Sequence, residues 1–575
     1  MQNGNDFLIS LGQEISRRRF TAYFSGIGLA ASLLPGILWA KMQDAKTPKI
    51  TPELLEDAEK LAGVSFTDKE RKLMVDDLND NLADYEKVHA VPLPNNVPPA
   101  IHFNPILPGM SFSTEKKPVH YSQPKAEKAP STLEEVAFWP ITRLAQLIRD
   151  RQVKSVDLTA MYLARLKKYD PKLYCVTALT EGRALEQAKR ADVEIAAGRY
   201  LGPLHGIPWG AKDLLAVKGY PTTWGSAPYK EQQFDHDATV VQRLDAAGAV
   251  LIAKLTLGEL AWGDVWYGGK TRNPWNLEQG ASGSSAGPGS ATAAGLVGFS
   301  IGTETWGSIV SPATRCGVTG LRPTYGRVSR HGAMALSWSM DKIGPMCRSV
   351  EDCAIVFNTI HGLDPKDNTL VDLPFNWDAS QRLSGLRVGY YKSAFDARRE
   401  NKSEKANEDA SLETLRQLGV TLIPIELQTT YPVEALSFIL NTEASAAFDE
   451  LTRSNRDDLM ARQERNAWPN AFRFARFTPA VEYIQANRIR TLIMQEMAKL
   501  FETVDVYLTP SSGNASLLTT NLTGHPTVVL PNGFDEKGSP TSVSFVGNLF
   551  AEAETLLVAR AYQEATAFHL KHPVL

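Results

Sequence analysis

Apolar stretches that suit buried strands alternate with amphipathic stretches along most of the chain. Helical periodicity is found over residues 155–169, 181–198 and 237–248, and the apolar run 249–254 follows directly. Further runs typical of strands cover 386–391, 421–426, 505–510, 526–531 and 541–547, before a last amphipathic stretch at the C-terminal end. Alternation of this kind predicts an α/β fold in which helices cover both faces of a sheet.

The first 130 residues have a different character. Residues 51–88 predict two helices, with Thr67 and Glu70 forming a capping box at the start of the second. Residues 92–130 are rich in proline, which indicates a linker or an extended strap on another surface. The composition changes near Ser131, where Ser131 and Glu134 predict another capping box. We therefore expect an N-terminal extension over 41–130 and the main domain over 131–575.

The N-terminal 40 residues carry the pattern of an export signal. Arg17, Arg18 and Arg19 precede an uncharged, mildly apolar run over residues 22–40, and the S-R-R-x-F order is similar to the twin-arginine type. We expect export by the twin-arginine machinery. The protein is then either periplasmic, after removal of residues 1–40, or anchored facing the periplasm through residues 20–40. A buried N-terminal helix is the alternative.

Composition excludes several classes of function. The net charge is −3, so no electrostatic feature favours nucleic acid as a partner. The four cysteines are too few for a disulfide scaffold, and they form no C-x-x-C pair. The histidines form no H-E-x-x-H motif. We therefore expect buried free thiols and neither a metal nor an organic cofactor.

A glycine- and serine-rich stretch over residues 280–310 is the first candidate for chemistry. Serine is a weak nucleophile until a base takes its proton, and no histidine lies in this stretch. Ser285 fits the G-x-S-x-G nucleophile elbow, but that elbow needs a strand directly before it, and the polar segment before Ser285 is not one. Ser308 instead follows a predicted strand, at the place where α/β sheets put their sites.

Two features near Ser308 suit acyl transfer. The backbone N–H groups of Thr305, Trp306, Gly307 and Ser308 can converge on one oxyanion. Lys212 ends a short apolar strand, where burial favours a neutral amine that can accept a proton from serine. Taken alone, each feature also fits an ordinary loop or a surface lysine.

Three blocks together resemble the amidase signature family. These blocks are "GPLHGIPWGAKD" with Lys212, "GSSAG" with Ser284, and "GTETWGSIVSPATRCGVTGLRPTYGRVSR" with Ser308. The resemblance covers residues 131–575 and implies a large mixed sheet covered by helices. It also implies that Ser308 is the nucleophile, that Ser284 is a bridging serine on a cis peptide, and that Lys212 is the terminal base. Gly283 would contact the substrate.

The sequence departs from the family pattern G-T-D-T-G-G-S-I-R at three positions. Glu304 replaces the acid, Trp306 replaces a glycine, and Val310 replaces the arginine. We expect the Trp306 indole to enter the acyl pocket or to lie against Arg315, which stands in for the lost arginine in this hypothesis.

Aromatic residues shortly before the serine-rich stretch allow two interpretations. Trp262, Trp266 and Tyr267 either pack in the core or form an aromatic wall that selects the acyl group.

The resemblance implies hydrolysis of a small-molecule amide to an acid plus ammonia or an amine. Residues 51–105 also resemble, more weakly, the small C subunit of the tRNA-dependent amidotransferase. The first alternative is therefore a glutaminase that resembles the larger, amide-cleaving subunit of that enzyme and supplies ammonia to a partner, although export would separate it from charged tRNA. The second alternative is a binding protein whose site is impaired by Trp306.

Overall fold

The computed structural model describes residues 50–125, 127–427 and 430–575. The chain divides into two compact units, Met1–Leu93 and Pro94–Leu575. The predicted export signal over residues 1–40 lies outside the described residues. None of the helices within the described ranges is long and apolar enough to cross a membrane.

The first unit contains the two helices that the sequence predicts, α3 (Pro52–Ala62) and α4 (Asp68–His89). The capping box before α4 is confirmed, because Thr67 N donates to Glu70 Oε2 at 2.6 Å and Glu70 N donates to Thr67 Oγ1 at 3.4 Å. Arg71 of α4 pairs with Glu59 of α3 at 2.8 Å, so a charged contact joins the two helices.

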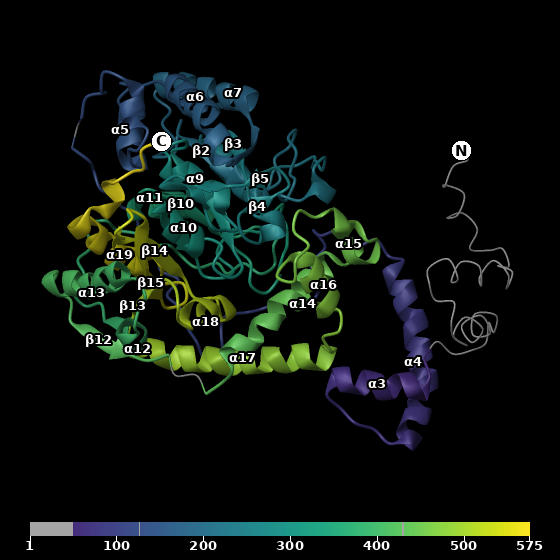
Figure 1. The fold of residues 1–575 in the computed structure, drawn as a ribbon. Helices are drawn as coiled ribbons and strands as arrows, with labels where there is room; N and C mark the ends of the chain where they lie inside the picture. The colour runs from purple at the N-terminus through teal and green to yellow at the C-terminus, as the bar shows by residue number, and fades with distance from the viewer. Residues whose placement is uncertain (1–49, 126, 428–429) are drawn as a thin grey trace, which may run out of the picture. The chain divides into compact units, whose positions relative to one another are not determined.

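The second unit is built on an eleven-stranded mixed sheet (Figure 1). Its strands, in spatial order, are β1 (Val176–Leu179), β3 (Val250–Leu255), β2 (Pro208–Lys212), β8 (Phe299–Glu304), β10 (Lys342–Cys347), β9 (Thr319–Arg322), β14 (Thr527–Phe534), β15 (Pro540–Gly547), β13 (Val506–Pro510), β11 (Val388–Tyr391) and β12 (Leu422–Ile425). The predicted strands within 249–254 and 386–547 are all present. β2 runs parallel to both β3 and β8, whereas β10 is antiparallel to β8.

Helices surround this sheet, as the alternating sequence pattern predicts. They are α5 (Ile141–Arg149), α6 (Ser155–Leu173), α7 (Glu181–Ala196), α8 (Thr239–Ala246), α9 (Ala286–Ala293), α10 (Val310–Cys316), α11 (Val350–Ile360), α12 (Lys392–Asp396), α13 (Lys402–Gln417), α14 (Phe438–Ala447), α15 (Asp449–Arg453), α16 (Trp468–Ala475), α17 (Ala480–Phe501), α18 (Ser516–Thr523) and α19 (Glu552–Thr566). Short strands β4 (Val265–Trp266), β5 (Gly269–Lys270), β6 (Arg272–Asn273) and β7 (Asn276–Gly280) form two small ribbons.

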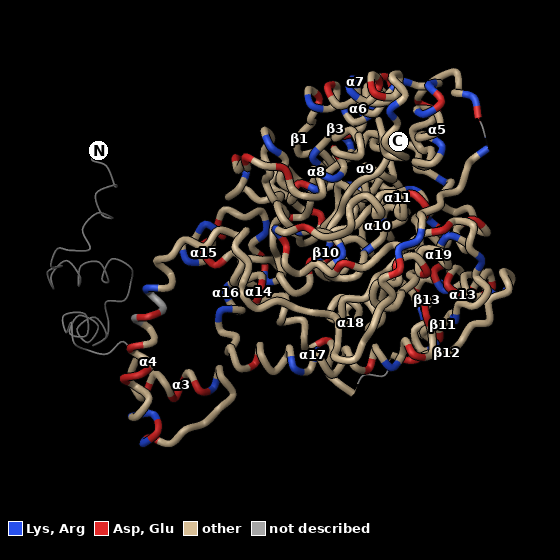
Figure 2. Tube along the Cα trace, turned by 180° about the vertical axis from the view of Figure 1, so that it is seen from behind, with Lys and Arg blue, Asp and Glu red and all other residues tan. Residues whose placement is uncertain are grey.

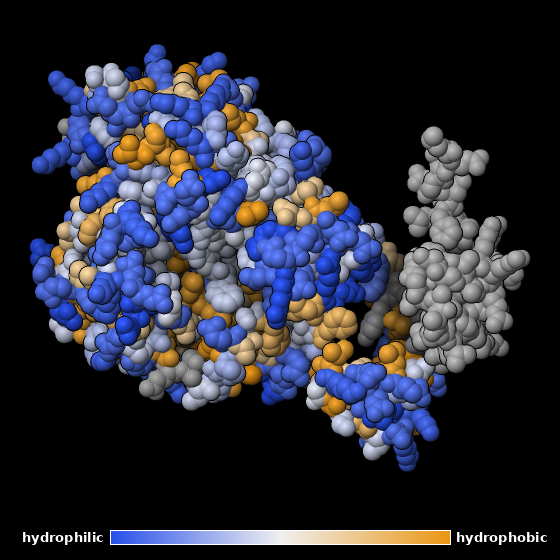
Figure 3. Space-filling view, in the orientation of Figure 1, coloured by the Kyte–Doolittle hydropathy of each residue, from blue (hydrophilic) through white to orange (hydrophobic). Residues whose placement is uncertain are grey.

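Two apolar clusters lie on opposite faces of the sheet. On β14, Val528 and Leu530 belong to the large cluster that includes side chains of α11 and α19, whereas Val529 belongs to a smaller cluster with residues of α9 and α10. Successive side chains of a strand point to opposite faces, so α10 lies on the face away from α11. Charged residues concentrate on the outer helices, with a smaller interior group near β10 (Figure 2). On the face drawn in Figure 3, apolar residues form only small groups.

The proline-rich segment lies along the body of the second unit from Pro94 onward. Phe103 packs edge-on against Tyr325, and His120 N donates to the carbonyl of Trp377 at 2.9 Å. Ser122 N donates to Glu351 Oε1 at 2.6 Å. Residues 94–125 therefore form an extended strap that packs on the rest of the second unit.

The capping box predicted at Ser131 and Glu134 is displaced by one residue. Thr132 and Glu135 form the box, because the helical turn begins at Leu133. Glu134 instead pairs with Arg165 of α6 at 3.3 Å. The prediction placed the right motif one position too early.

Candidate active site

Lys212 ends β2 and is completely buried at the centre of a hydroxyl cluster. Its Nζ lies 2.8 Å from Ser284 Oγ, 2.8 Å from Thr303 Oγ1 and 3.0 Å from Ser285 Oγ. Thr303 is brought here because β8 pairs with β2 in parallel, with Ala211 opposite Ile301. Motifs in the sequence identified Lys212 and Ser284 but not Thr303, whose position in the strand gave no chemical signal.

Burial lowers the pKa of Lys212 well below its ordinary value. The carboxylates of Asp341 and Glu304 act in the opposite direction, because negative charge favours the ammonium form. Neither carboxylate forms an ion pair with Lys212 in the described part of the chain. The balance therefore favours a neutral amine, which is the form that can accept a proton.

The two serines after β7 have different surroundings. Ser284 follows a cis peptide bond from Gly283 and contacts only Lys212 through its hydroxyl within the described residues. Ser285 is fully buried, donates to Thr303 O at 3.1 Å and accepts from Thr303 N at 3.1 Å. The Ser285 hydroxyl thus both donates to and accepts from the backbone of Thr303, and this geometry favours a structural role.

Ser308 lies between β8 and α10 and lines a cavity of about 580 Å³. Gly283, Thr305 and Trp306 line the same cavity. The carbonyl of Ser308 accepts the N–H of Ser285 at 3.2 Å, which ties the two serine-bearing segments together. Gly307 alone in this turn takes a positive φ, +84°, so Trp306 occupies the other glycine position of the family pattern without backbone strain.

Glu304 fixes the turn that carries Ser308. Its Oε2 accepts the N–H groups of Ile309 and Val310 at 2.8 and 2.9 Å, directly after Ser308. Its Oε1 accepts from Arg322 Nη1 at 2.7 Å and from Asn521 Nδ2 at 2.8 Å. Burial by itself would raise the pKa of Glu304, but Arg322 and these donors lower it to about 2.

The arginine that pairs with Glu304, the acid of the motif, is therefore Arg322 of β9. Arg322 is completely buried, and its Nη2 also donates to Thr520 Oγ1, Thr527 Oγ1 and the carbonyl of His525. Arg315, which the motif comparison suggested as the substitute for the arginine missing at position 310, is exposed and donates to Gln279 Oε1 at 3.2 Å. The family block "GLRPTYG" contains Arg322, but the sequence does not indicate that Arg322 pairs with Glu304.

The aromatic residues before the serine stretch separate in space. Trp262 lines the cavity beside Ser308 and packs edge-on against Trp468, with ring centroids 4.8 Å apart. Trp266 is buried against Gly268 and Tyr267, and neither Trp266 nor Tyr267 is among the described residues that line this cavity. Trp306, at 40% exposure, lines the cavity together with Arg315.

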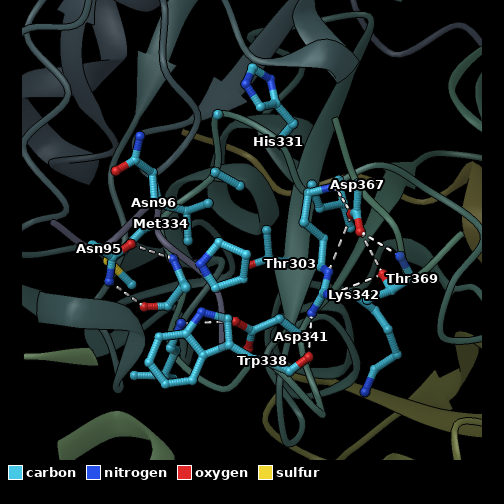
Figure 4. Close-up of a pocket in the computed structure, with 18 of the residues that line it drawn as sticks. Asn95, Asn96, Thr303, His331, Met334, Trp338, Asp341, Lys342, Asp367 and Thr369 are labelled. Atoms are coloured by element: carbon cyan, nitrogen blue, oxygen red, sulfur yellow. Dashed lines mark hydrogen bonds and ion pairs between the residues drawn. The ribbon is translucent and has the colours of Figure 1, made fainter. Parts of the chain in front are cut away.

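A second cavity, of about 250 Å³, includes Thr303 of the hydroxyl cluster in its lining (Figure 4). Thr303 and Thr305 line it, as do the strap residue Asn95 and the half-buried Asp341. Thr305 Oγ1 donates to Asp341 Oδ1 at 2.6 Å. Thr305 therefore faces both cavities, because it also lines the one that contains Ser308.

Within residues 50–125, 127–427 and 430–575, no group of three or more His, Cys, Asp or Glu side chains could hold a metal ion. The four cysteines are buried and free.

Replacing Glu304 by Gln should destabilise the protein by about 3–5 kcal/mol, because the change leaves the buried Arg322 charge uncompensated. The matched control is Glu413→Gln, which removes an exposed partner of Arg416 and should cost below about 1 kcal/mol. Denaturant unfolding of both variants measures the difference. Equal losses would contradict the assigned role of the Glu304–Arg322 pair.

In the parent protein, the contribution of this pair to the free energy of unfolding should be complete above pH 4.5 and decline as the pH falls toward about 2.

Comparison with known proteins identifies the family of the chain. The amidase family profile, described as Amidase, matches residues 157–556. The A subunit of the glutamyl-tRNA(Gln) amidotransferase from Acinetobacter baumannii is 34% identical over 487 residues, covering 76% of this chain and 97% of the relative. The native peptide amidase from Stenotrophomonas maltophilia is 30% identical with a TM-score of 0.66, over 75% of this chain and 98% of that one. A bacterial aryl acylamidase of the amidase signature family, 20% identical over 76% of this chain and 97% of its own, shares the fold with a TM-score of 0.67. The chain belongs to the amidase signature family, whose reaction is the hydrolysis of amide bonds.

Proposed function

We propose that this protein hydrolyses a carboxylic amide through an acyl-enzyme on Ser308, with Ser284 and Lys212 as the proton relay. The observation that carries the proposal is the Lys212 amine, fully buried and 2.8 Å from Ser284 Oγ. A neutral lysine can serve serine as a base where histidine is absent. Similarity to the peptide amidase and to the amidotransferase chain supports the assignment.

The relay accounts for each proton. Ser308 Oγ attacks the amide carbon while its proton passes to Ser284, and the Ser284 proton passes to Lys212. Backbone N–H groups of Thr305, Trp306, Gly307 and Ser308 stabilise the oxyanion. The protons return along the same path to the leaving nitrogen, which departs as ammonia or an amine. Water then attacks the ester by the same relay, which releases the acid and regenerates Ser308.

Glu304 assists this chemistry without touching the substrate. By accepting the N–H groups of Ile309 and Val310, its carboxylate holds the turn that orients Ser308. A preorganised turn stabilises the developing charge without reorganisation during the reaction. The ion pair with Arg322 keeps this carboxylate ionised at neutral pH.

A second candidate is glutamine hydrolysis that supplies ammonia to a partner. It is favoured by the similarity to the glutamyl-tRNA(Gln) amidotransferase chain along 97% of that relative. Ammonia release from glutamine by the purified chain, compared with release from simple primary amides, separates the two candidates.

Labelling with a fluorophosphonate tests the nucleophile. We expect one adduct on the parent protein and on Ser285→Ala, located at Ser308 by peptide mass mapping. Ser308→Ala should give none. Lys212→Met should slow labelling by roughly 100-fold or more, because general-base assistance typically contributes 10²–10⁴. Circular dichroism confirms that each variant folds. An adduct lost with Ser285→Ala but retained with Ser308→Ala would overturn the assignment.

The pH dependence of labelling tests the protonation state of Lys212. Because burial lowers the lysine pKa, the rate should reach a plateau well below the pH at which an ordinary lysine loses its proton, and should fall on the acid side as the amine becomes charged. Asp341→Asn removes a negative charge that favours the ammonium, so the acid limb should move to lower pH. A rate that keeps rising up to about pH 10 would show a lysine with its ordinary pKa and contradict the relay.

A further inference from the structure

The cavity beside Ser308 has a broad apolar wall. Trp262, Trp306 and Trp468 line it, and Leu336 and Leu440 complete the apolar surface. Trp262 and Trp468 are held edge-on, whereas Trp306 leaves 40% of its surface exposed. At about 580 Å³ the cavity is in the range of sites that bind drug-sized ligands. These dimensions favour a substrate with a flat apolar group over a simple primary amide.

Two cations line the same cavity on one side. Arg315 donates to Gln279 Oε1 at 3.2 Å, and a Cβ atom placed on Gly280 would lie 2.5 Å from Lys270 Cε. Lys270 and Arg315 therefore lie beside successive residues of β7, the strand that leads directly to Gly283 and Ser284. Both side chains thus line the cavity that also contains Ser308.

One carboxylate lies near Lys270, because the same Cβ atom on Gly280 would lie 1.9 Å from Asp264 Oδ2. Lys270 and Arg315 form no ion pair in the part of the chain that the structure describes. Asp264 is the sole acid among the described residues that line the cavity, and its Oδ2 accepts the N–H of Ser282 at 3.0 Å. The cavity beside Ser308 consequently has an excess of positive charge next to an aromatic wall.

We propose that the substrate is an amide that also carries an anionic group, such as a carboxylate, together with a flat apolar group. The anion pairs with Arg315 and Lys270, and the apolar group lies against Trp262, Trp306 and Trp468. An arginine binds a carboxylate through two parallel N–H groups, so Arg315 provides more orientation than Lys270. This inference rests on the proposed amide hydrolysis at Ser308.

Matched ligand pairs test the charge preference. The compounds 3- and 4-carbamoylbenzoate are compared with 3- and 4-nitrobenzamide, because carboxylate and nitro groups have nearly the same shape but differ in charge. The measurement is the concentration that protects Ser308 from fluorophosphonate labelling, and it works whether or not the ligand is turned over. For at least one isomer, the anionic ligand should protect at a concentration at least about tenfold lower, which corresponds to ~1.4 kcal/mol.

Variants then assign the preference to the two cations. Arg315→Met and Lys270→Met should each reduce the preference, and the double variant should abolish it without changing protection by the neutral amides. Arg416→Met, an exposed arginine of α13, is the matched control and should retain the full preference. Equal protection by charged and neutral ligands in the parent protein would overturn the inference. Absence of any Ser308 adduct would instead overturn the proposed function.

A separate set of hydrogen bonds joins the strap to the oxyanion turn. Asn95 Nδ2 donates to the carbonyl of Ala335 at 2.8 Å, and Ala335 N donates to Asn95 Oδ1 at 2.7 Å. The next two N–H groups, of Leu336 and Ser337, donate to Asp341 Oδ2 at 2.8 and 3.0 Å. The second oxygen of Asp341 accepts from Thr305, so the series ends at the turn that carries Ser308.

The geometry points to Asn95 as a positioning residue for catalysis. It acts through Ala335 on the 335–341 loop, which places both Thr305 and the cavity residue Leu336. An asparagine side chain satisfies one backbone N–H and one backbone C=O at once, which no apolar residue can do.

The Asn95→Ala variant should lower the rate of Ser308 labelling by roughly tenfold at saturating probe while leaving the half-saturating concentration nearly unchanged. Asn96→Ala is the matched control, because Asn96 lines the same cavity and its side chain makes no hydrogen bond within the described residues. Asn95→Asp, which keeps the acceptor, should restore part of the rate. The assignment would be overturned if Asn96→Ala lowered the labelling rate as much as Asn95→Ala does. It would also be overturned if a lowered Tm alone accounted for the loss with Asn95→Ala.

Discussion

An amine enclosed by protein cannot keep its charge cheaply, because water no longer solvates the ammonium form. Lys212 is in this position at the end of β2, where hydroxyl groups surround its Nζ in place of a carboxylate partner. The sheet supplies this environment: β8 brings Thr303 alongside, and the segment before α9 brings Ser284. The rest of the site is arranged around a base that burial itself has activated.

The turn after β8 shows how buried charge can fix a reacting group. Glu304 is held by Arg322 from β9 and by Asn521 from α18, and with its other oxygen it holds the backbone that follows Ser308. A buried carboxylate needs such complete hydrogen bonding to remain ionised. The glutamate side chain at this position, longer than the aspartate usual in the family, reaches all of these partners. Asp341 accepts from Thr305 in the same turn, so two carboxylates help to fix it.

Of the three departures from the family pattern, Trp306 is the one that lines the cavity beside Ser308. Trp306 and Arg315 both line the cavity beside Ser308, whereas Lys212 and Ser284, which carry the proposed relay, are unchanged. A change in the cavity wall can therefore alter which amide is bound while leaving the path of the proton intact.

Local sequence determined much of this protein: the alternation that produces the sheet, most of its strands and helices, the capping box of α4, and the residues proposed for the relay. Periodicity and motifs report neighbours along the chain, so they are sufficient for such features.

Only the tertiary structure decided that Arg322 pairs with Glu304, that Trp262 and not Trp266 lines the cavity, and that Asn95 contacts Ala335 across 240 positions. These pairings depend on strand order and on the faces to which side chains point. Residues distant in the sequence become neighbours only when the sheet is assembled, and no local pattern encodes which of them will meet.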